Sequence, residues 1–173
     1  MALPACHRGR AADAGAPDTP AGRETPSGLP VPRYVATKFE TVNARSGPGD
    51  DYPAVWTYRA RGLPLQVTAE TAEWRRVCDP DGQTAWVHRR TVAETARVMR
   101  VAATPLPMRA KPADSARAVA DLAARATAAL VSCEDGWCRV TADKTSGWVP
   151  AAEVWGTAPQ RQCPPAGAGA PAG

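Results

Sequence analysis

Cysteine and histidine, the residue types most often used in catalysis and metal binding, are sparse in this chain of 173 residues. There are five cysteines and two histidines, and His7 lies near the start, away from the apolar segments. With His7 set aside for that reason, Cys78 and His88 are the one cysteine–histidine pair left to suggest a nucleophile and its base. Such a base needs a third group that holds it in place.

Two acidic stretches have the composition of ion-binding loops, but their spacing does not fit one. The stretch "GPG" at 47–49 precedes Asp50 and Asp51 and lacks the Lys-Ser or Lys-Thr of a nucleotide phosphate loop. Adjacent carboxylates point apart in an extended chain, so they do not chelate one ion easily. The stretch "DPDG" at 79–82 lacks the further ligands of a calcium loop and favours a turn. We therefore predict two turns, with no metal and no cofactor.

The overall composition excludes several classes of partner. Lysine and arginine number 21 against 17 aspartates and glutamates, and the arginines are scattered, so no nucleic-acid interface is predicted. No apolar run approaches the roughly 20 residues that span a membrane. Six tryptophans against one phenylalanine is a stronger signal, because tryptophan is costly to place without a role in packing or binding.

The two ends of the chain differ in composition from its middle. Residues 1–33 and residues 157–173 are rich in Ala, Pro and Gly and poor in core-forming side chains. Such segments bury too little apolar surface to fold, so we expect both to be disordered. The start lacks the apolar segment of a signal peptide. Its composition is nevertheless typical of a mature exported protein, and a start codon assigned too late would give the same beginning. We expect a periplasmic or secreted location.

The middle of the chain repeats itself at an offset of 62 to 64 residues. The matching stretches are "NARSGP" with "PMRAKP", "EWRRV" with "GWCRV", and "TAWVH" with "SGWVP", which pair Arg45 with Arg109, Trp74 with Trp137, and Trp86 with Trp148. The Ala-rich stretch "ADSARAVADLAARATAAL" has helical propensity, but the register aligns its second half with the alternating run "LPLQVTAE" and predicts a strand. His88 aligns with Pro150, and the Cys78–His88 pair does not recur. We predict no catalytic residues and no enzymatic activity.

These motifs resemble the bacterial SH3-like (SH3b) domains, here in tandem. The first copy matches through "VNARSGPGDDYPAV", "EWRRV" and "AWVHRRTV", and the second through "PMRAKPADSARAVADL", "DGWCRV" and "SGWVPAAEV". The chain is also similar to exported alphaproteobacterial proteins that contain such domains. The resemblance implies an all-β fold of two small, partly open barrels, at residues 34–95 and 96–156, between the two tails. It also implies a non-catalytic binding or targeting module of the cell envelope.

The aromatic residues of the first copy are the candidates for a ligand-binding face. Tyr52, Trp56, Tyr58 and Trp74 could together stack on a sugar or a peptide, and Trp137 is the counterpart of Trp74. The alternatives are that Trp56 and Tyr58 share the core face, and that the other tryptophans cover a barrel end or pack between the copies. The family resemblance makes peptidoglycan or an envelope protein the expected partner. The alternative is a structural or assembly protein with no small ligand, and the sequence does not determine the oligomeric state.

The cysteines bear on the compartment as well as on the fold. Cys133 and Cys138 flank "EDGW", and the repeat register aligns them with Glu70 and Arg75. One copy thus has an opposite-charge pair where the other has two thiols, as expected of positions that face each other across a hairpin. A disulfide is favoured over two reduced thiols or a zinc site, since zinc needs further ligands. The sequence does not decide whether Cys6, Cys78 or Cys163 pair.

Overall fold

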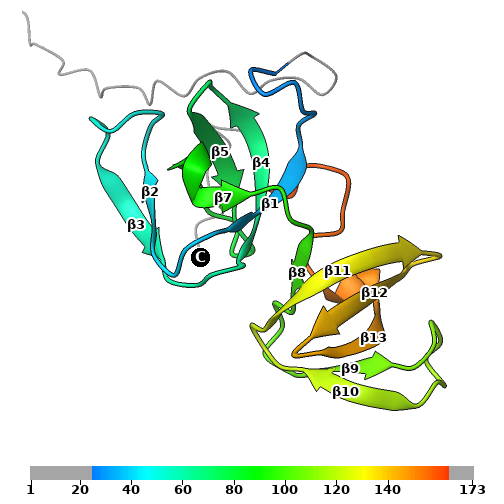
Figure 1. The fold of residues 1–173 in the computed structure, drawn as a ribbon. Coiled ribbons are helices and arrows are strands. Elements are labelled where there is room, and N and C mark those ends of the chain that lie inside the picture. Colours follow the sequence, from blue (N-terminus) through cyan, green and yellow to red (C-terminus); the bar gives the residue numbers. More distant parts are fainter. Residues whose placement is uncertain (1–24, 164–173) are drawn as a thin grey trace, which may run out of the picture.

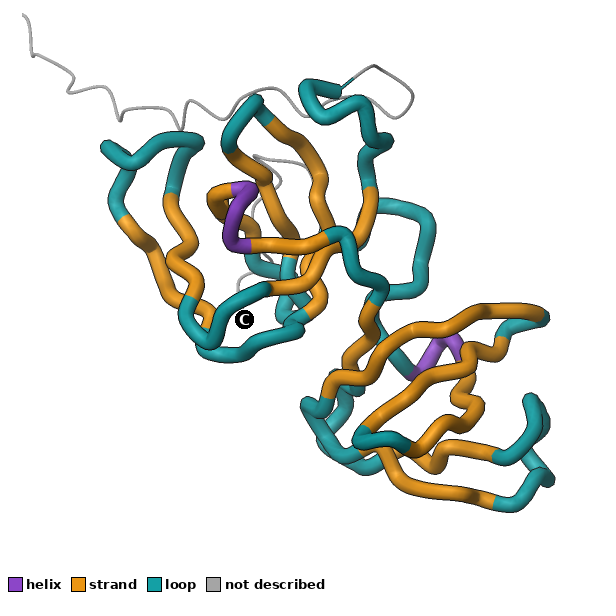
Figure 2. Tube along the Cα trace, in the orientation of Figure 1, coloured by secondary structure: helices purple, strands orange, loops and turns teal. Residues whose placement is uncertain are grey.

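The computed structural model describes residues 25–163, which form two antiparallel sheets (Figures 1 and 2). The first sheet has the strand order β3-β2-β6-β5-β4-β1-β7. Its elements are β1 (Arg33–Thr37), β2 (Val42–Arg45), β3 (Ala54–Tyr58), β4 (Pro64–Glu70), β5 (Trp74–Cys78), β6 (Thr84–His88), the short helix η1 (Arg89–Thr91) and β7 (Val92–Ala93).

The second sheet repeats this arrangement, with the order β10-β9-β13-β12-β11-β8. Its elements are β8 (Arg97–Met99), β9 (Leu106–Arg109), β10 (Ala118–Leu122), β11 (Thr127–Glu134), β12 (Trp137–Ala142), β13 (Thr145–Pro150) and η2 (Ala151–Glu153). Neither sheet closes into a barrel within residues 25–163. The predicted tandem of two all-β units is confirmed, and the Ala-rich stretch forms strands β10 and β11, with no helix between them.

Each sheet covers its own apolar core, because residues that alternate along a strand share one face. The first core is built around Val35, Leu65, Val67, Val77 and Val87, which are all fully buried. The second core contains their counterparts and is built around fully buried residues of five strands: Val98, Met108, Leu122, Val140 and Val149. The two copies also share a β-bulge, after Val67 in β4 and after Leu130 in β11.

Parts of both expected tails are packed against the first sheet. Val31 is buried in the first core, and the Ser27 amide donates a hydrogen bond to Glu70 (2.8 Å). At the other end, residues 157–163 return from the second sheet to the first and are here called the C-terminal strap (Figure 1). The expectation of disorder over residues 25–33 and 157–163 is thus corrected, because hydrogen bonds and burial offset the entropy cost of ordering them. The remainder of both tails lies outside the described residues.

The strap is held by side chains on the outer face of the first sheet, the side away from its core. The amide of Gln66 donates to Gln160 O (2.9 Å) and accepts from the Gln162 amide (2.8 Å). The Tyr34 hydroxyl donates to Ala158 O (3.0 Å). Cys163, at the end of the strap, forms a disulfide with Cys78 of β5. The strap is therefore held through its backbone groups and is covalently fixed at one end.

Two further contacts join the units. The ring of Trp155 meets the ring of Tyr34 edge-on, with centroids 5.3 Å apart. Arg125 makes a bidentate ion pair with Asp81 in the turn after β5 (2.7 and 2.8 Å). Each contact joins one residue of the first unit to one of the second, so the junction is built from side chains as well as from the connecting segment between β7 and β8.

Candidate functional site

Trp56 and Tyr58, two of the predicted ligand-binding residues, lie on the core side of β3. They pair with Ala44 and Val42 of β2, both fully buried. Tyr58 is itself buried and its hydroxyl donates to Asp79 Oδ2 (3.2 Å). Burial, followed by the negative charge of Asp79, raises the pKa of Tyr58 far above its ordinary value. The geometry favours the packing alternative for both side chains.

Tyr52 has the exposed ring that the prediction requires. Its ring is 40% exposed and lies against the backbone of Gly47. A Cβ on Gly47 would come within 2.2 Å of the Tyr52 ring, so the glycine leaves the space that the ring occupies. The "GPG" turn thus serves as a seat for an aromatic side chain.

Trp74 is close to Tyr52 through Arg45, although its own side chain is only 8% exposed. The Arg45 guanidinium lies 6.0 Å from the centre of the Trp74 ring, within the usual cation–π range. The same guanidinium donates to Tyr52 O (2.7 Å) and pairs with Asp50 (3.3 Å). His88, the register partner of Trp74, meets its ring edge-on with centroids 5.2 Å apart. We call Arg45, Tyr52, Trp74 and His88 the Trp74 surface.

Charged groups border the Trp74 surface on the His88 side. His88 Nδ1 accepts a hydrogen bond from the Arg90 amide (3.2 Å), which leaves Nε2 to carry the proton. Nε2 lies 3.6 Å from Glu73 Oε2, and Arg89 Nε donates to the same oxygen (3.1 Å). The hydrogen bond from Arg89 lowers the pKa of Glu73. The border is therefore polar and can donate as well as accept hydrogen bonds.

The second copy keeps the tryptophan but loses these neighbours. Trp137 pairs with Pro150 in the position that His88 occupies in the first copy, and it is half-buried. Arg109, the counterpart of Arg45, donates to Ala116 O (3.1 Å), seven residues ahead, as Arg45 does to Tyr52 O. The repeated arginine thus fixes the corner after its strand in both copies. Only the first copy adds a cation–π contact and a histidine to its tryptophan.

Cys78 and His88, the one pair considered for nucleophilic catalysis, are not brought together. Cys78 pairs with Thr84 at one end of β6, whereas His88 is at the other end. The Cys78 sulfur is bonded to Cys163 and so provides no thiolate. The pairing of Cys78 was left open by the sequence, and the odd cysteine beyond the repeat, Cys163, was its only signal.

The stretch "DPDG" forms a turn that is organised by one carboxylate. Asp79 Oδ1 accepts hydrogen bonds from the amides of Asp81 (3.0 Å) and Gln83 (2.9 Å). Burial raises the pKa of Asp79, whereas the hydrogen bond from Arg125 lowers that of Asp81. Within residues 25–163 no group of three or more His, Cys, Asp and Glu residues could hold a metal ion.

The predicted equivalence of the two hairpins is confirmed. Glu70 faces Arg75 across β4 and β5 and pairs with its Nε (3.1 Å). Cys133 faces Cys138 across β11 and β12 and forms a disulfide with it. Burial by itself would raise the pKa of Glu70, but hydrogen bonds from Ser27 and Arg33 outweigh it and lower that pKa to about 2. The Glu70–Arg75 ion pair of the first unit and the Cys133–Cys138 disulfide of the second thus occupy equivalent positions.

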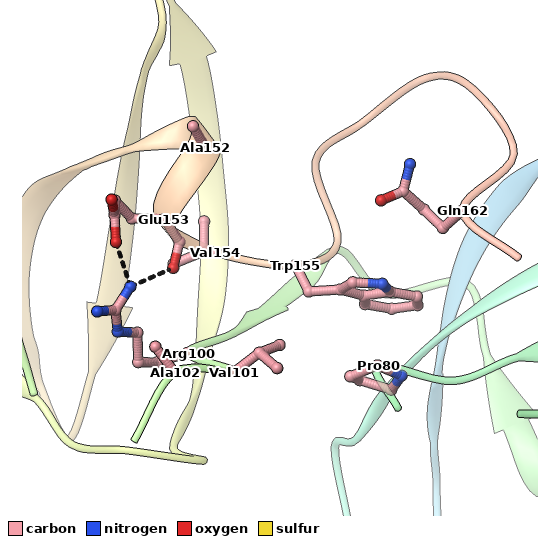
Figure 3. A pocket seen from close by; sticks show the side chains of 9 residues that line it. All are labelled: Pro80, Arg100, Val101, Ala102, Ala152, Glu153, Val154, Trp155 and Gln162. Atoms are coloured by element: carbon pink, nitrogen blue, oxygen red, sulfur yellow. Dashed lines mark hydrogen bonds and ion pairs between the residues drawn. The ribbon is translucent and has the colours of Figure 1, made fainter. Parts of the chain in front are cut away.

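A cavity of about 390 Å³ lies between the two units, beside the strap (Figure 3). Arg100 and Glu153 border one side of it, and the Arg100 guanidinium donates to both the backbone oxygen (2.9 Å) and the carboxylate of Glu153. Pro80, Trp155 and Gln162 border the other side. Arg100 also donates to Thr104 O (3.0 Å), so it is already fully engaged in holding the loop. Sequence reasoning did not identify Trp155, because it lies at the end of the repeat.

Comparison with known proteins identifies the two units. A model of the bacterial SH3 domain family matches residues 38–94 and 102–156, which together make up more than half of the chain. The chain therefore belongs to the bacterial SH3 domain family and contains two of these domains in tandem. Proteins of this family are typically binding modules.

Two solved structures and one negative result complete the comparison. The structures of NlpC2 and NlpC1 from Trichomonas vaginalis are each 12% identical to the chain, with a TM-score of 0.34. They match 72% and 80% of this chain and 48% and 49% of their own chains, so it spans about half their length. No curated protein matches. Within the described residues there is no helix that is long and apolar enough to cross a membrane.

Proposed function

We propose that the chain is a non-catalytic binding module of the cell envelope that contacts peptidoglycan or an envelope protein through the Trp74 surface. The observation that carries this proposal is the exposure of Tyr52, whose backbone oxygen accepts a hydrogen bond from the Arg45 guanidinium that also lies 6.0 Å from the centre of the Trp74 ring. An exposed aromatic side chain with charged side chains near it suits a sugar or peptide, which offers both apolar and polar atoms.

The two disulfides support the proposed location. Disulfides persist in oxidising compartments such as the periplasm and the extracellular space, and are rare in the cytosol. Both bonds are intramolecular, and they join Cys78 to Cys163 and Cys133 to Cys138. A periplasmic or secreted location accounts for both disulfide bonds.

Retention on purified peptidoglycan tests the proposal. We expect Tyr52→Ala to reduce retention about fivefold or more, since a stacking aromatic contributes on the order of 1–3 kcal/mol. Phe39→Ala is the matched control, because Phe39 is another exposed aromatic of the first domain (54% exposed) outside the Trp74 surface. Equal retention of the wild-type chain and Tyr52→Ala, with both folded, would refute peptidoglycan binding at this surface. Capture of an envelope protein that depends on Tyr52 would support the other proposed partner.

A second candidate is a structural or assembly protein, and the domain junction favours it. Trp155 packs on Tyr34, and the strap joins the second domain to the first. Trp74 and Trp137, the tryptophans first considered for this role, instead contact residues of their own domains. If the protein co-purifies with partners that remain bound in Tyr52→Ala but are lost in Trp155→Ala, the structural role is favoured over the Trp74 surface.

A further inference from the structure

A second cavity, of about 490 Å³, opens at the junction of the two domains and shares no residue with the Trp74 surface. Three segments line it: the end of β1 with the loop after it (residues 36–40), the turn at 61–62, and residues 93–97, from the end of β7 to the start of β8. All of the lining residues except Arg97 come from residues 36–95, and Arg97 is the contribution of the second domain. Its volume falls within the range of small-molecule sites.

The charges that line this cavity are unbalanced. Lys38, Arg61 and Arg97 line it, against a single acid, Glu40. Among the described residues, none of the three cations lies within 4.0 Å of a carboxylate, whereas Arg33, Arg75, Arg100 and Arg125 all have acidic partners. Three like charges around one concavity repel one another, and an anion between them relieves that repulsion.

Arg97 is the cation that the fold holds most firmly. Its Nη2 donates to Thr127 Oγ1 (3.0 Å), and its Nε is buried without a hydrogen-bond partner among residues 25–163. The side chain lies against Gly62, where a Cβ would come within 2.9 Å of Nε. Gly62 has a φ of +78°, so this glycine serves both the turn and the close approach of the arginine. Fixing an arginine before the ligand arrives reduces the entropy cost of binding.

We propose that this junction cavity binds an anionic group, a carboxylate or a phosphate, carried by a larger ligand. Arg97 provides the fixed positive charge, and Lys38 and Arg61, which are exposed and unpaired by the described acids, close on the ligand from the rim. The volume exceeds that of a single carboxylate or phosphate, so the rest of the ligand also enters the cavity. Because both domains contribute, binding is expected to stabilise their junction.

Titration of the full chain with two probes tests the site. A triglutamate peptide supplies carboxylates and glycerol phosphate supplies a phosphate, and NMR follows the Arg97 Nε signal and the amides of Gly62 and Thr95. We expect Arg97→Gln to weaken binding of the preferred probe about tenfold or more, as for the loss of a charge-assisted hydrogen bond. Lys38→Gln should weaken it less. Arg117→Gln, which removes an exposed cation of the second domain, is the control and should leave affinity unchanged.

A matched pair of glycine variants separates pre-organisation of Arg97 from its charge. Gly62→Ala and Gly82→Ala place a side chain at nearly the same backbone conformation, φ +78° and +80°. A Cβ at Gly82 meets no atom within 4 Å, whereas a Cβ at Gly62 would displace Arg97. Gly62→Ala should lose at least as much stability as Gly82→Ala, because its Cβ also displaces Arg97, and only Gly62→Ala should lose affinity for the probe.

Each result of the titration either supports or overturns the proposed anion site. Binding of either probe that depends on Arg97 supports the site, and the preferred probe distinguishes carboxylate from phosphate ligands. Shifts spread evenly over exposed cations such as Lys111 and Lys144, or equal affinities of Arg97→Gln and Arg117→Gln, would show a solvated basic surface and overturn the proposal. Absence of binding by both probes would overturn it as well. None of these results bears on peptidoglycan retention through Tyr52, which is measured separately.

Discussion

The two SH3 domains have the same strand order and the same bulge, yet their central hairpins differ in burial. Every residue of β4 and β5 is buried, whereas the last four residues of β11 are exposed and β12 alternates. Thr68 in the first bulge is 2% exposed, and its counterpart in the second, Val131, is 57% exposed. The alternating pattern of β12 is what a sheet with one covered face should show. The first sheet departs from it because the chain covers its outer face as well.

The C-terminal strap covers only the first domain because the side chains that hold it are present only there. Gln66 and Cys78, which face each other across β4 and β5, hold the strap through the amide and the disulfide. Their counterparts in the second domain, Ala129 and Thr141, offer neither a side-chain amide nor a sulfur. Two nearly equal folds thus acquire different surfaces through a few substitutions. Four changes should alter this difference between the two domains, and their expected costs in stability differ.

Cys163→Ser should cost the most stability. The disulfide to Cys78 closes a loop across 85 residues, and a loop of that length is worth about 4–5 kcal/mol on the chain-entropy estimate. Urea unfolding monitored by tryptophan fluorescence measures the loss, and hydrogen exchange at the Gln162 amide reports release of the strap. A loss below about 1 kcal/mol would mean that the strap remains bound without its sulfur, and the difference in burial would then rest on the hydrogen bonds of Gln66 and Tyr34.

Acid should destabilise the first domain through Glu70. Its pKa is about 2 in the folded state against 4.5 in the unfolded chain, so its stabilising effect is complete above pH 4.5 and disappears as the pH falls toward 2. The shift corresponds to roughly 3 kcal/mol. Free energies of unfolding at several pH values between 2 and 6 test this.

Glu70→Gln should remove this pH dependence and also destabilise the protein at neutral pH, because Arg33 and Arg75 then lack their buried partner. Glu134→Gln, at the exposed end of β11, is the control. If the slope against pH persists in Glu70→Gln, another carboxylate is responsible for it.

Loss of the Cys133–Cys138 disulfide should cost less stability than loss of the Cys78–Cys163 disulfide. This cost should not depend on pH. Cys133→Ser opens a loop of only five residues, for about 2 kcal/mol on the same estimate. Cys133 is exposed, so the serine itself is tolerated, and Cys138 remains in the core as a small apolar side chain. Equal losses for Cys133→Ser and Cys163→Ser, by urea unfolding, would contradict the loop-length argument.

Arg125→Gln should have the smallest effect. Its ion pair with Asp81 links the two domains, but the two side chains are 48% and 56% exposed. Exposed pairs contribute about 0–1 kcal/mol and are screened by salt. The expected loss should therefore shrink between low and high ionic strength, with Arg117→Gln as a control. A loss above about 2 kcal/mol would indicate that this contact positions the domains.

Local patterns were sufficient for much of the fold. The repeat register aligned Glu70 and Arg75 with Cys133 and Cys138, and both pairs face each other, since cross-strand neighbours vary together in chemistry. The same register assigned a strand to an Ala-rich stretch with helical propensity, because tertiary pairing overrides intrinsic preference.

The candidate site was less predictable. Alternation showed that Trp56 and Tyr58 share a face, but the period of two does not say which face meets the core. The C-terminal strap has no periodic pattern, and it is held through backbone groups that every residue offers. Cys163, one of two cysteines outside the repeat, was the single sign that this segment had a partner.

The sequence by itself therefore determined the strands, the pairing of the central hairpin in each domain and the turns, because these depend on residues that are near one another along the chain. Only the tertiary structure decided which outer face is covered, where Cys78 finds its partner, and how three cations come to surround one cavity. Those features join segments far apart in sequence, as the 85 residues between Cys78 and Cys163 illustrate. No periodic pattern along the chain encodes such contacts, because they depend on how distant segments pack against one another in three dimensions.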